Sequence, residues 1–158
     1  MPQYWLLKSE PTSFSIQDLA ESPGQTTCWE GVRNYQARNF MKTMNVGDRA
    51  FFYHSNADPP CIVGMVEVVK AAYPDPYAFD RKSRYFDAKS TPESPRWFLV
   101  DVKLIEIFPN PLSLESLRTM KGLESMELLR KGSRLSVQPV GSQEWQCVCS
   151  LVASSKRA

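Results

Sequence analysis

The stretch from Pro60 to Lys70 constrains the fold more than any other part of the chain. As a strand, it would carry Ile62, Gly64, Val66 and Val68 on one face and Cys61, Val63, Met65 and Glu67 on the other. Both faces are largely apolar, which is typical of a strand in the middle of a sheet that curls around a core. The segment therefore predicts a curled or barrel-like sheet with this strand near its centre.

Alternating apolar patterns predict the other strands of the sheet. These strands are expected at residues 4–8, 49–55, 96–108, 134–139 and 144–151. The last two lie on either side of the Gly141-Ser142 turn, which predicts a terminal hairpin. Cys147 and Cys149 alternate with Val148 in its second strand, so both should point to one face as small apolar side chains.

Helical patterns are short and fall between the strands. Ser15 is the expected cap of a helix that runs to Glu21, and Asn34 is the expected cap of the next one. After Asn34 the apolar residues Ala37, Phe40, Met41 and Met44 have helical spacing. Two more short helices are expected at 113–121 and 124–131. The fold class is therefore α+β, a partly closed barrel of about six strands with short helices packed outside.

Composition limits the classes of function. The 158 residues fit a single domain, 1–158, and 19 Lys+Arg against 17 Asp+Glu give a net charge of +2. That charge lacks the basic excess of a non-specific nucleic-acid binder, so any such contact must be local. Four cysteines without metal-ligand spacing and a single histidine predict neither a metal nor a cofactor, and indicate a reducing compartment. No apolar run approaches membrane-spanning length.

The sequence contains few residues in patterns typical of catalytic sites, and we predict no catalytic residue. Only His54 has an ordinary pKa near neutrality, and the sequence contains neither a Gly-x-Ser-x-Gly elbow nor a phosphate-binding Gly-rich loop. His54 stands at a strand end. It either hydrogen-bonds a neighbouring residue there or lines a pocket, and the sequence leaves both open.

Large aromatic residues occur outside the periodic patterns. Trp29 lies in an irregular segment, Trp97 on the non-core side of its strand, and Tyr53 at a strand end. Aromatic side chains in such places build stacking sites for flat rings. Core packing is the other explanation for each of them.

The surroundings of Trp29 favour a binding site. The segment from Trp29 to Asn34 ends at a helix start, which places free backbone N–H groups beside an aromatic ring. Arg33 and Arg38 flank it and could hold a phosphate. The alternative is that Asn34 only caps the helix while the arginines form a solvated face. The proline-rich stretch Tyr73–Pro95 lacks any period and predicts a lid or binding loop.

Several blocks of the sequence together resemble the EVE domain family. They are Tyr4–Pro11, Trp29–Asn39, Phe52–Ser55, Gly64–Lys70, and Pro95–Trp97 with Val100–Val102, and they keep the family's order over about residues 3–150. The resemblance implies a PUA-like pseudo-barrel related to the YTH domain. It also implies a nucleic-acid-binding module that captures a modified base, such as methylated or hydroxymethylated cytosine in DNA or a modified base in RNA.

The resemblance implies a set of site residues. Trp29 would be the first aromatic wall of the base pocket and Trp97 a second one, and Glu10 could accept a hydrogen bond from an exocyclic amine. The remaining pocket residues would be Ser9, Glu30, Gly31, Asn34, Tyr53, His54 and Ser55. The candidate phosphate contacts are Lys8, Arg33, Arg38 and Lys103.

We accordingly expect a non-enzymatic protein, a monomer or weak dimer, that binds DNA or RNA without metal, cofactor or membrane. The nuclear relatives carry a basic leader and nothing of that kind precedes Tyr4, so we expect a bacterial cytoplasmic form, or a nuclear one if the source is eukaryotic.

Two alternatives to this function stay open. One is a hydrolase of modified nucleosides, similar to the ASCH-type PUA-like proteins, that would use Lys8 and Glu10. The other is a protein-interaction adaptor that would use the loop at 73–95.

Overall fold

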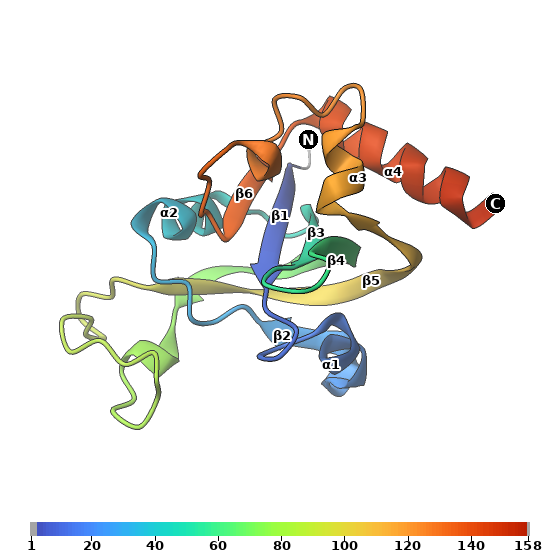
Figure 1. Ribbon diagram of the computed structural model, residues 1–158. Coiled ribbons are helices and arrows are strands. Elements are labelled where there is room, and N and C mark those ends of the chain that lie inside the picture. Colours follow the sequence, from blue (N-terminus) through green and yellow to red (C-terminus); the bar gives the residue numbers. More distant parts are fainter. Residues whose placement is uncertain (1–2, 158) are drawn as a thin grey trace.

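The computed structural model describes residues 3–157. Its six strands are β1 (Tyr4–Ser9), β2 (Thr26–Cys28), β3 (Arg49–His54), β4 (Cys61–Pro74), β5 (Phe98–Ser113) and β6 (Val137–Val140). They form one open sheet in the order β2-β5-β4-β3-β1-β6 (Figure 1). β1 and β3 are parallel and all other neighbours are antiparallel, so the sheet is mixed.

β4 lies between β3 and β5, as its two apolar faces predict. Gly64 sits at its most crowded point, where a Cβ atom would lie 2.5 Å from the carbonyl oxygen of Glu106 and would overlap the side chain of Ile16. A glycine at this position therefore lets the first helix, α1 (Ile16–Glu21), pack directly on the sheet.

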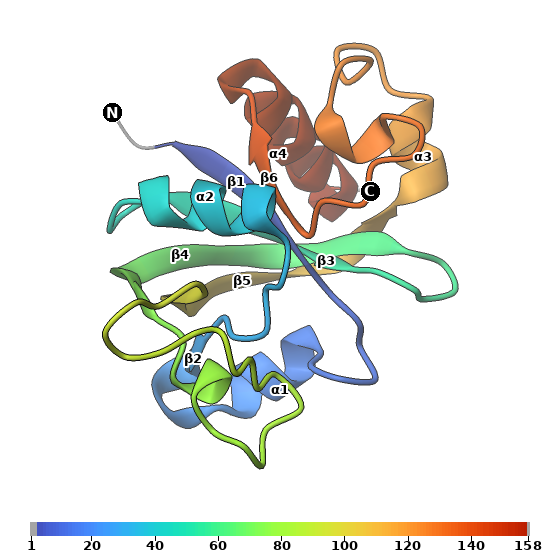
Figure 2. The same ribbon diagram turned by 90° about the vertical axis from the view of Figure 1, so that its left-hand side faces the viewer.

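The sheet separates two hydrophobic cores. Leu7 and Phe52 point into the first core, whereas their neighbours Leu6 and Phe51 point into the second, as strand alternation requires. The first core is covered by α1 and α2 (Tyr35–Thr43), and the second by α3 (Leu114–Arg118), the 3₁₀ turn η3 (Glu127–Leu129) and α4 (Ser142–Arg157). Figures 1 and 2 show α3 and α4 together at one end of the molecule and α1 beside β2 at the other.

The two predicted helix caps are confirmed. The Ser15 hydroxyl accepts from the Asp18 N–H while the Asp18 carboxylate accepts from the Ser15 N–H, which closes a capping box on α1. The Asn34 side chain accepts from the Ala37 N–H at 2.9 Å and caps α2. Asn34 itself has an extended backbone, with φ −122° and ψ 129°.

The predicted terminal hairpin is wrong. Only β6 forms, and Ser142–Arg157 is the helix α4, so Cys147 and Cys149 are half-buried on a helix and do not share one face of a strand. Trp145, Val148 and Val152 have helical spacing and enter the second core. Glu144 accepts from the Gly141 N–H at 3.0 Å and so supports the helix start. The sixth strand of the sheet is instead β2, which pairs with β5.

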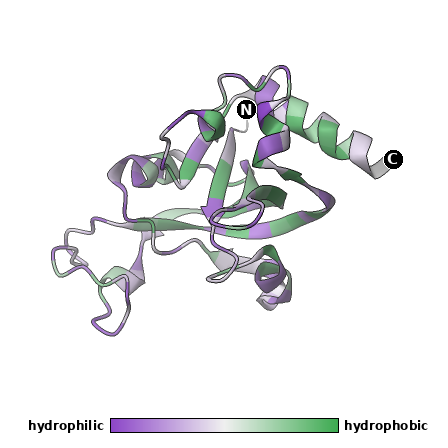
Figure 3. Ribbon diagram, in the orientation of Figure 1, coloured by the Kyte–Doolittle hydropathy of each residue, from purple (hydrophilic) through white to green (hydrophobic). Residues whose placement is uncertain are grey.

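The segment before β6 also differs from expectation. The helix expected at 113–121 ends at Arg118, and the one expected at 124–131 is only the single turn η3. No helix among residues 3–157 is both long enough and apolar enough to cross a membrane. Figure 3 shows that the strands carry long apolar stretches, whereas the β4–β5 loop (residues 75–97) is largely hydrophilic.

Candidate functional site

A cavity of about 580 Å³ opens where the end of β1, the segment after β2 and the β4–β5 loop meet. Its size falls within the range of about 300–1,000 Å³ found for ligand pockets. It is lined by Lys8, Ser9, Glu10, Ser13, Phe14, Thr27, Cys28, Trp29, Glu30, Gly31, Val32, Arg33, Arg84, Tyr85 and Ser136. The lining therefore combines aromatic rings, two carboxylates and three basic side chains.

Trp29 belongs both to the cavity and to the first core. Its side chain is only 7% exposed, and its ring meets the ring of Phe52 edge-on with 5.3 Å between centroids. Its backbone N–H donates to the Val100 carbonyl oxygen at 2.8 Å, which continues the pairing of β2 with β5. The indole is thus fixed by core packing and presents only a small part of its surface to the cavity.

Gly31 allows the β4–β5 loop to close against the segment after Trp29. Its φ is +82°, a conformation that favours glycine, and a Cβ atom there would lie 2.5 Å from the ring of Tyr85. Tyr85 therefore lies directly on the Gly31 backbone. The contact makes Tyr85 a second aromatic wall of the cavity.

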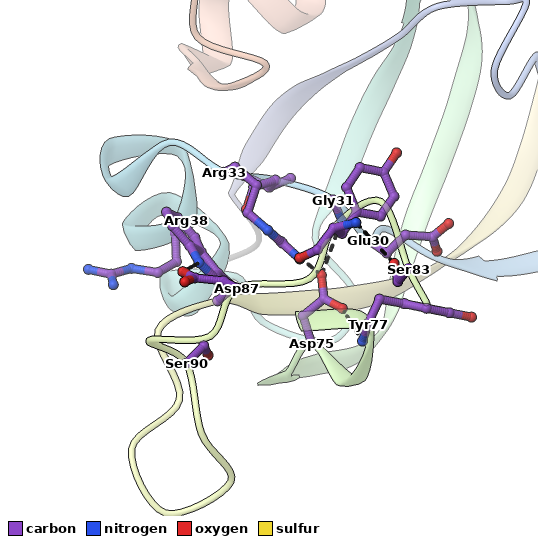
Figure 4. Close-up of polar contacts among 12 residues, drawn as sticks. Glu30, Gly31, Arg33, Arg38, Asp75, Tyr77, Ser83, Asp87 and Ser90 are labelled. Atoms are coloured by element: carbon purple, nitrogen blue, oxygen red, sulfur yellow. Dashed lines mark hydrogen bonds and ion pairs between the residues drawn. The ribbon is translucent and has the colours of Figure 1, made fainter. Parts of the chain in front are cut away.

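Asp75 ties the same two segments together from below (Figure 4). Its side chain is fully buried, and its Oδ2 accepts from the Gly31 N–H and from Nη1 of Arg33, both at 3.1 Å. Its Oδ1 accepts from the Tyr77 N–H at 2.9 Å. A buried carboxylate is stable only when paired and hydrogen-bonded, and these three donors satisfy that requirement.

Arg33, the ion-pair partner of Asp75, also contacts the β4–β5 loop. Its Nη2 donates to the Tyr85 carbonyl oxygen at 2.8 Å, and its guanidinium carbon lies 5.4 Å from the Tyr85 ring centroid and 5.3 Å from that of Trp97. Such distances are typical of cation–π contacts. Arg33 therefore orders the cavity wall, and Asp75 already compensates its charge.

The carboxylates of Glu10 and Glu30 lie on the exposed side of the cavity. The Cys28 thiol donates to Oε2 of Glu30 at 3.0 Å, and burial together with this hydrogen bond raises the pKa of Cys28 to about 12. The thiol thus stays protonated and orients Glu30. Both carboxylates are suitable acceptors for an exocyclic amine.

The end of β1 supplies the remaining polar groups. Burial lowers the pKa of Lys8, although the negative charge of Glu127 acts in the opposite direction. The Ser9 hydroxyl donates to the Phe14 carbonyl oxygen at 2.6 Å and so keeps its oxygen available as an acceptor. Lys8 and Ser9 therefore offer the cavity a cation and an acceptor.

The structure brings together half of the residues that the sequence analysis assigned to the site. Lys8, Ser9, Glu10, Trp29, Glu30, Gly31 and Arg33 line the cavity. Asn34, Tyr53, His54, Ser55, Trp97, Arg38 and Lys103 do not line it. Whether the first set contacts a base or a phosphate stays a prediction.

The residues outside the cavity have structural partners. Nε2 of His54 accepts from the Ile16 N–H at 3.1 Å, and the Ser55 N–H donates to the Ser9 carbonyl oxygen at 3.0 Å. Tyr53 belongs to the second core, and Trp97 stacks on Tyr35 with 4.8 Å between centroids. His54 thus adopts the neighbour-bonded alternative.

Three others lie on α2 or the sheet. Asn34 caps α2, and Nη1 of Arg38 donates to the Arg96 carbonyl oxygen at 2.9 Å. Lys103 is an exposed residue of β5, opposite Thr26. Of the aromatic and basic residues that line the cavity, Phe14, Arg84 and Tyr85 were not predicted from the sequence, although the loop that carries the last two was singled out by its length and its prolines.

The described chain, residues 3–157, contains no group of three or more His, Cys, Asp or Glu side chains that could hold a metal ion. The class of this protein is a PUA-like α+β module. It is defined by an open mixed sheet with helices packed around it and by an aromatic, charged cavity.

Comparison with known proteins identifies the family. The EVE domain model matches residues 3–151, so the chain belongs to the EVE domain family. Thymocyte nuclear protein 1 of Mus musculus is 43% identical over 168 residues, which cover 96% of this chain and 74% of that protein. The relation to this family that the sequence blocks predict is confirmed.

Solved structures agree with this assignment. A crystal structure of a Pseudomonas putida protein superposes with a TM-score of 0.90 at 48% identity and covers 94% of this chain and 99% of that one. The human THYN1 protein in complex with DNA that contains 5-methylcytosine gives a TM-score of 0.89 at 41% identity, with 95% and 97% covered. An ASCH protein from Zymomonas mobilis, 10% identical with a TM-score of 0.52, shares the fold alone.

Proposed function

We propose that this protein binds nucleic acid and captures a modified base, without turning it over, in the cavity between β1, β2 and the β4–β5 loop. One observation carries the proposal: the lining of one cavity combines the aromatic residues Trp29 and Tyr85 with hydrogen-bond acceptors and cations. The complex of the human relative with 5-methylcytosine DNA supports the same role here. DNA with 5-methylcytosine is therefore the first ligand to test, and RNA with the same base is the parallel one.

The free energy gained when the base stacks in the cavity is similar in size to the cost of taking it out of the nucleic acid. Taking a base out of a stack costs a few kcal/mol, and stacking on an aromatic ring returns roughly 1–3 kcal/mol per base. A methyl group that fills apolar space adds about 0.8 kcal/mol. Discrimination of a methylated base by the methyl group alone should therefore be about fourfold.

The carboxylates give the cavity a preference among bases. Glu10 and Glu30 accept hydrogen bonds, so an exocyclic amine beside them is favoured over a carbonyl oxygen. Cytosine and adenine carry that amine, whereas uracil does not. We therefore infer that methylated cytosine suits this rim better than a modified uracil.

A direct test replaces the indole of Trp29 with a smaller ring. In fluorescence-anisotropy titrations with oligonucleotides carrying one 5-methylcytosine or one cytosine, the wild type should prefer the methylated strand. Trp29→Phe should weaken binding by about threefold, because only the small part of the indole that faces the cavity is lost for contact with the base. Trp145→Phe is the matched control, since Trp145 is equally buried, 6% exposed, but lies in the second core.

Two results would contradict the proposal. Equal binding of methylated and unmethylated strands by the wild type would remove the base-capture role. Turnover of modified nucleosides that disappears in Lys8→Ala would replace it with the hydrolase alternative, because Lys8 and Glu10 line the same cavity.

A further inference from the structure

Phe86 is an exposed aromatic residue that directly follows the cavity wall in the sequence. It follows Arg84 and Tyr85, which both line the cavity, and it is 38% exposed. Among residues 3–157, it is the only phenylalanine whose side chain counts as exposed. A single exposed apolar side chain is common on protein surfaces, so a role for Phe86 depends on how it is held and on the charges around it.

The backbone on both sides of Phe86 is anchored to the body of the protein. Before it, the Tyr85 carbonyl oxygen accepts from Arg33, and the Tyr85 ring lies on Gly31. After it, Oδ2 of Asp87 accepts from Nε1 of Trp97 at 2.7 Å, and the Asp87 N–H donates to the Ala78 carbonyl oxygen at 3.0 Å. Figure 4 shows Asp87 in the same loop as Ser83 and Ser90. Phe86 is therefore held at the surface in a fixed place.

The charges around Phe86 favour a polyanion. The exposed basic residues of this part of the loop are Arg81, Lys82, Arg84 and Lys89. Residues 80–89 carry only two carboxylates against these four cations, Asp80 and Asp87, and each accepts a backbone N–H bond, from Lys82 and Lys89 respectively. The stretch therefore has an excess of positive charge. An exposed aromatic side chain flanked by cations matches the chemistry of a nucleic acid, whose base faces stack on aromatic rings and whose backbone is anionic.

We propose that Phe86 enters a duplex beside the captured base and fills the space that this base leaves in the stack. The inference rests on the proposed function, because the space exists only when a base has been taken out of a duplex. An aromatic ring in the vacated space stacks on the neighbouring bases and so offsets part of the cost of taking the base out of the duplex. A single strand offers no such space, so Phe86 should matter for duplex capture alone.

The test compares one 5-methylcytosine oligonucleotide as a duplex and as a single strand. Phe86→Ala should weaken duplex binding about tenfold and change single-strand binding by less than about twofold, while Phe86→Leu should retain most of the duplex affinity. In the duplex with 2-aminopurine beside the methylated base, Phe86→Ala should also reduce the fluorescence rise that reports unstacking. Val46→Ala is the matched control, because Val46 is an exposed apolar residue, 64% exposed, outside the cavity.

The outcomes separate this inference from the proposed function. Equal losses on both ligands, an unchanged duplex affinity, or a wild type that prefers the methylated single strand but binds no duplex would each overturn the role of Phe86 alone. A wild type without any preference for the methylated base would overturn the proposed function, and this inference with it.

Discussion

At the scale of single residues, Gly31 decides whether the cavity has its second aromatic wall. Its positive φ and the closeness of the Tyr85 ring are independent constraints, and either one disfavours a side chain. Gly132 has nearly the same φ, +81°, but open space around it. Substitution of Gly132 therefore introduces backbone strain alone, whereas substitution of Gly31 introduces the same strain and also disturbs the contact with Tyr85.

Gly31→Ala should displace Tyr85 and weaken binding of the methylated oligonucleotide by about tenfold or more, because the displaced ring no longer stacks on the base. Gly132→Ala should carry a similar backbone cost, of about 1 kcal/mol, without affecting binding. Chemical denaturation and anisotropy titration of both variants measure the two effects. Equal affinities of the two variants would show that Tyr85 takes no part in binding.

At the scale of elements, α1 is docked on the sheet through His54. The imidazole Nε2 accepts from the Ile16 N–H, so it is neutral in the folded protein, and burial lowers its pKa below the ordinary value of 6.5. This hydrogen bond holds the start of α1 next to Phe14, which lines the cavity. The position of α1 thus depends on an unprotonated histidine.

The protonation of His54 makes stability depend on pH. Since the unfolded chain takes up this proton at higher pH than the folded chain, the contribution of His54 is complete above about pH 6.5 and is lost as pH falls toward the folded pKa. Thermal unfolding of the wild type should show a fall in Tm between pH 7.5 and 5. His54→Gln should show a smaller fall. Parallel curves for the two proteins would assign the pH dependence to other groups.

At the scale of the whole molecule, the small net charge of +2 leaves binding to local geometry. Three basic side chains, Lys8, Arg33 and Arg84, line the cavity, and one of them is already paired with Asp75. Long-range attraction to a phosphate backbone is accordingly weak. Shape and stacking must supply most of the affinity.

The salt dependence of binding measures this balance. With two to three phosphate contacts, log K for a methylated single strand should fall with log[salt] at a slope between about −1.4 and about −2.1. Lys8→Ala should reduce the slope by somewhat less than one, and Lys121→Ala, an exposed residue outside the cavity, should leave it unchanged. A slope steeper than about −5 would mean that phosphate contacts dominate.

Part of the candidate site could be predicted from the sequence. Trp29 stood out because it interrupts a periodic pattern, and the β4–β5 loop because of its length. Tyr85 and Phe14 carried no such signal, since an aromatic residue in a loop or before a helix has many possible neighbours. Trp97 was expected to form a wall of the nucleobase pocket. It instead stacks on Tyr35 outside the cavity, because the fold places the start of α2 against it.

The sequence by itself determined the central strand β4 and the caps of α1 and α2, because alternation and capping act over a few neighbouring residues. It also determined the family, through blocks of residues spread over most of the chain. Only the tertiary structure decided the helical state of Ser142–Arg157 and the walls of the cavity. In α4 both a strand and a helix pattern fit, and packing against the second core selects the helix. The cavity depends on contacts such as Gly31 to Asp75, 44 positions apart, and no local pattern encodes such a distance.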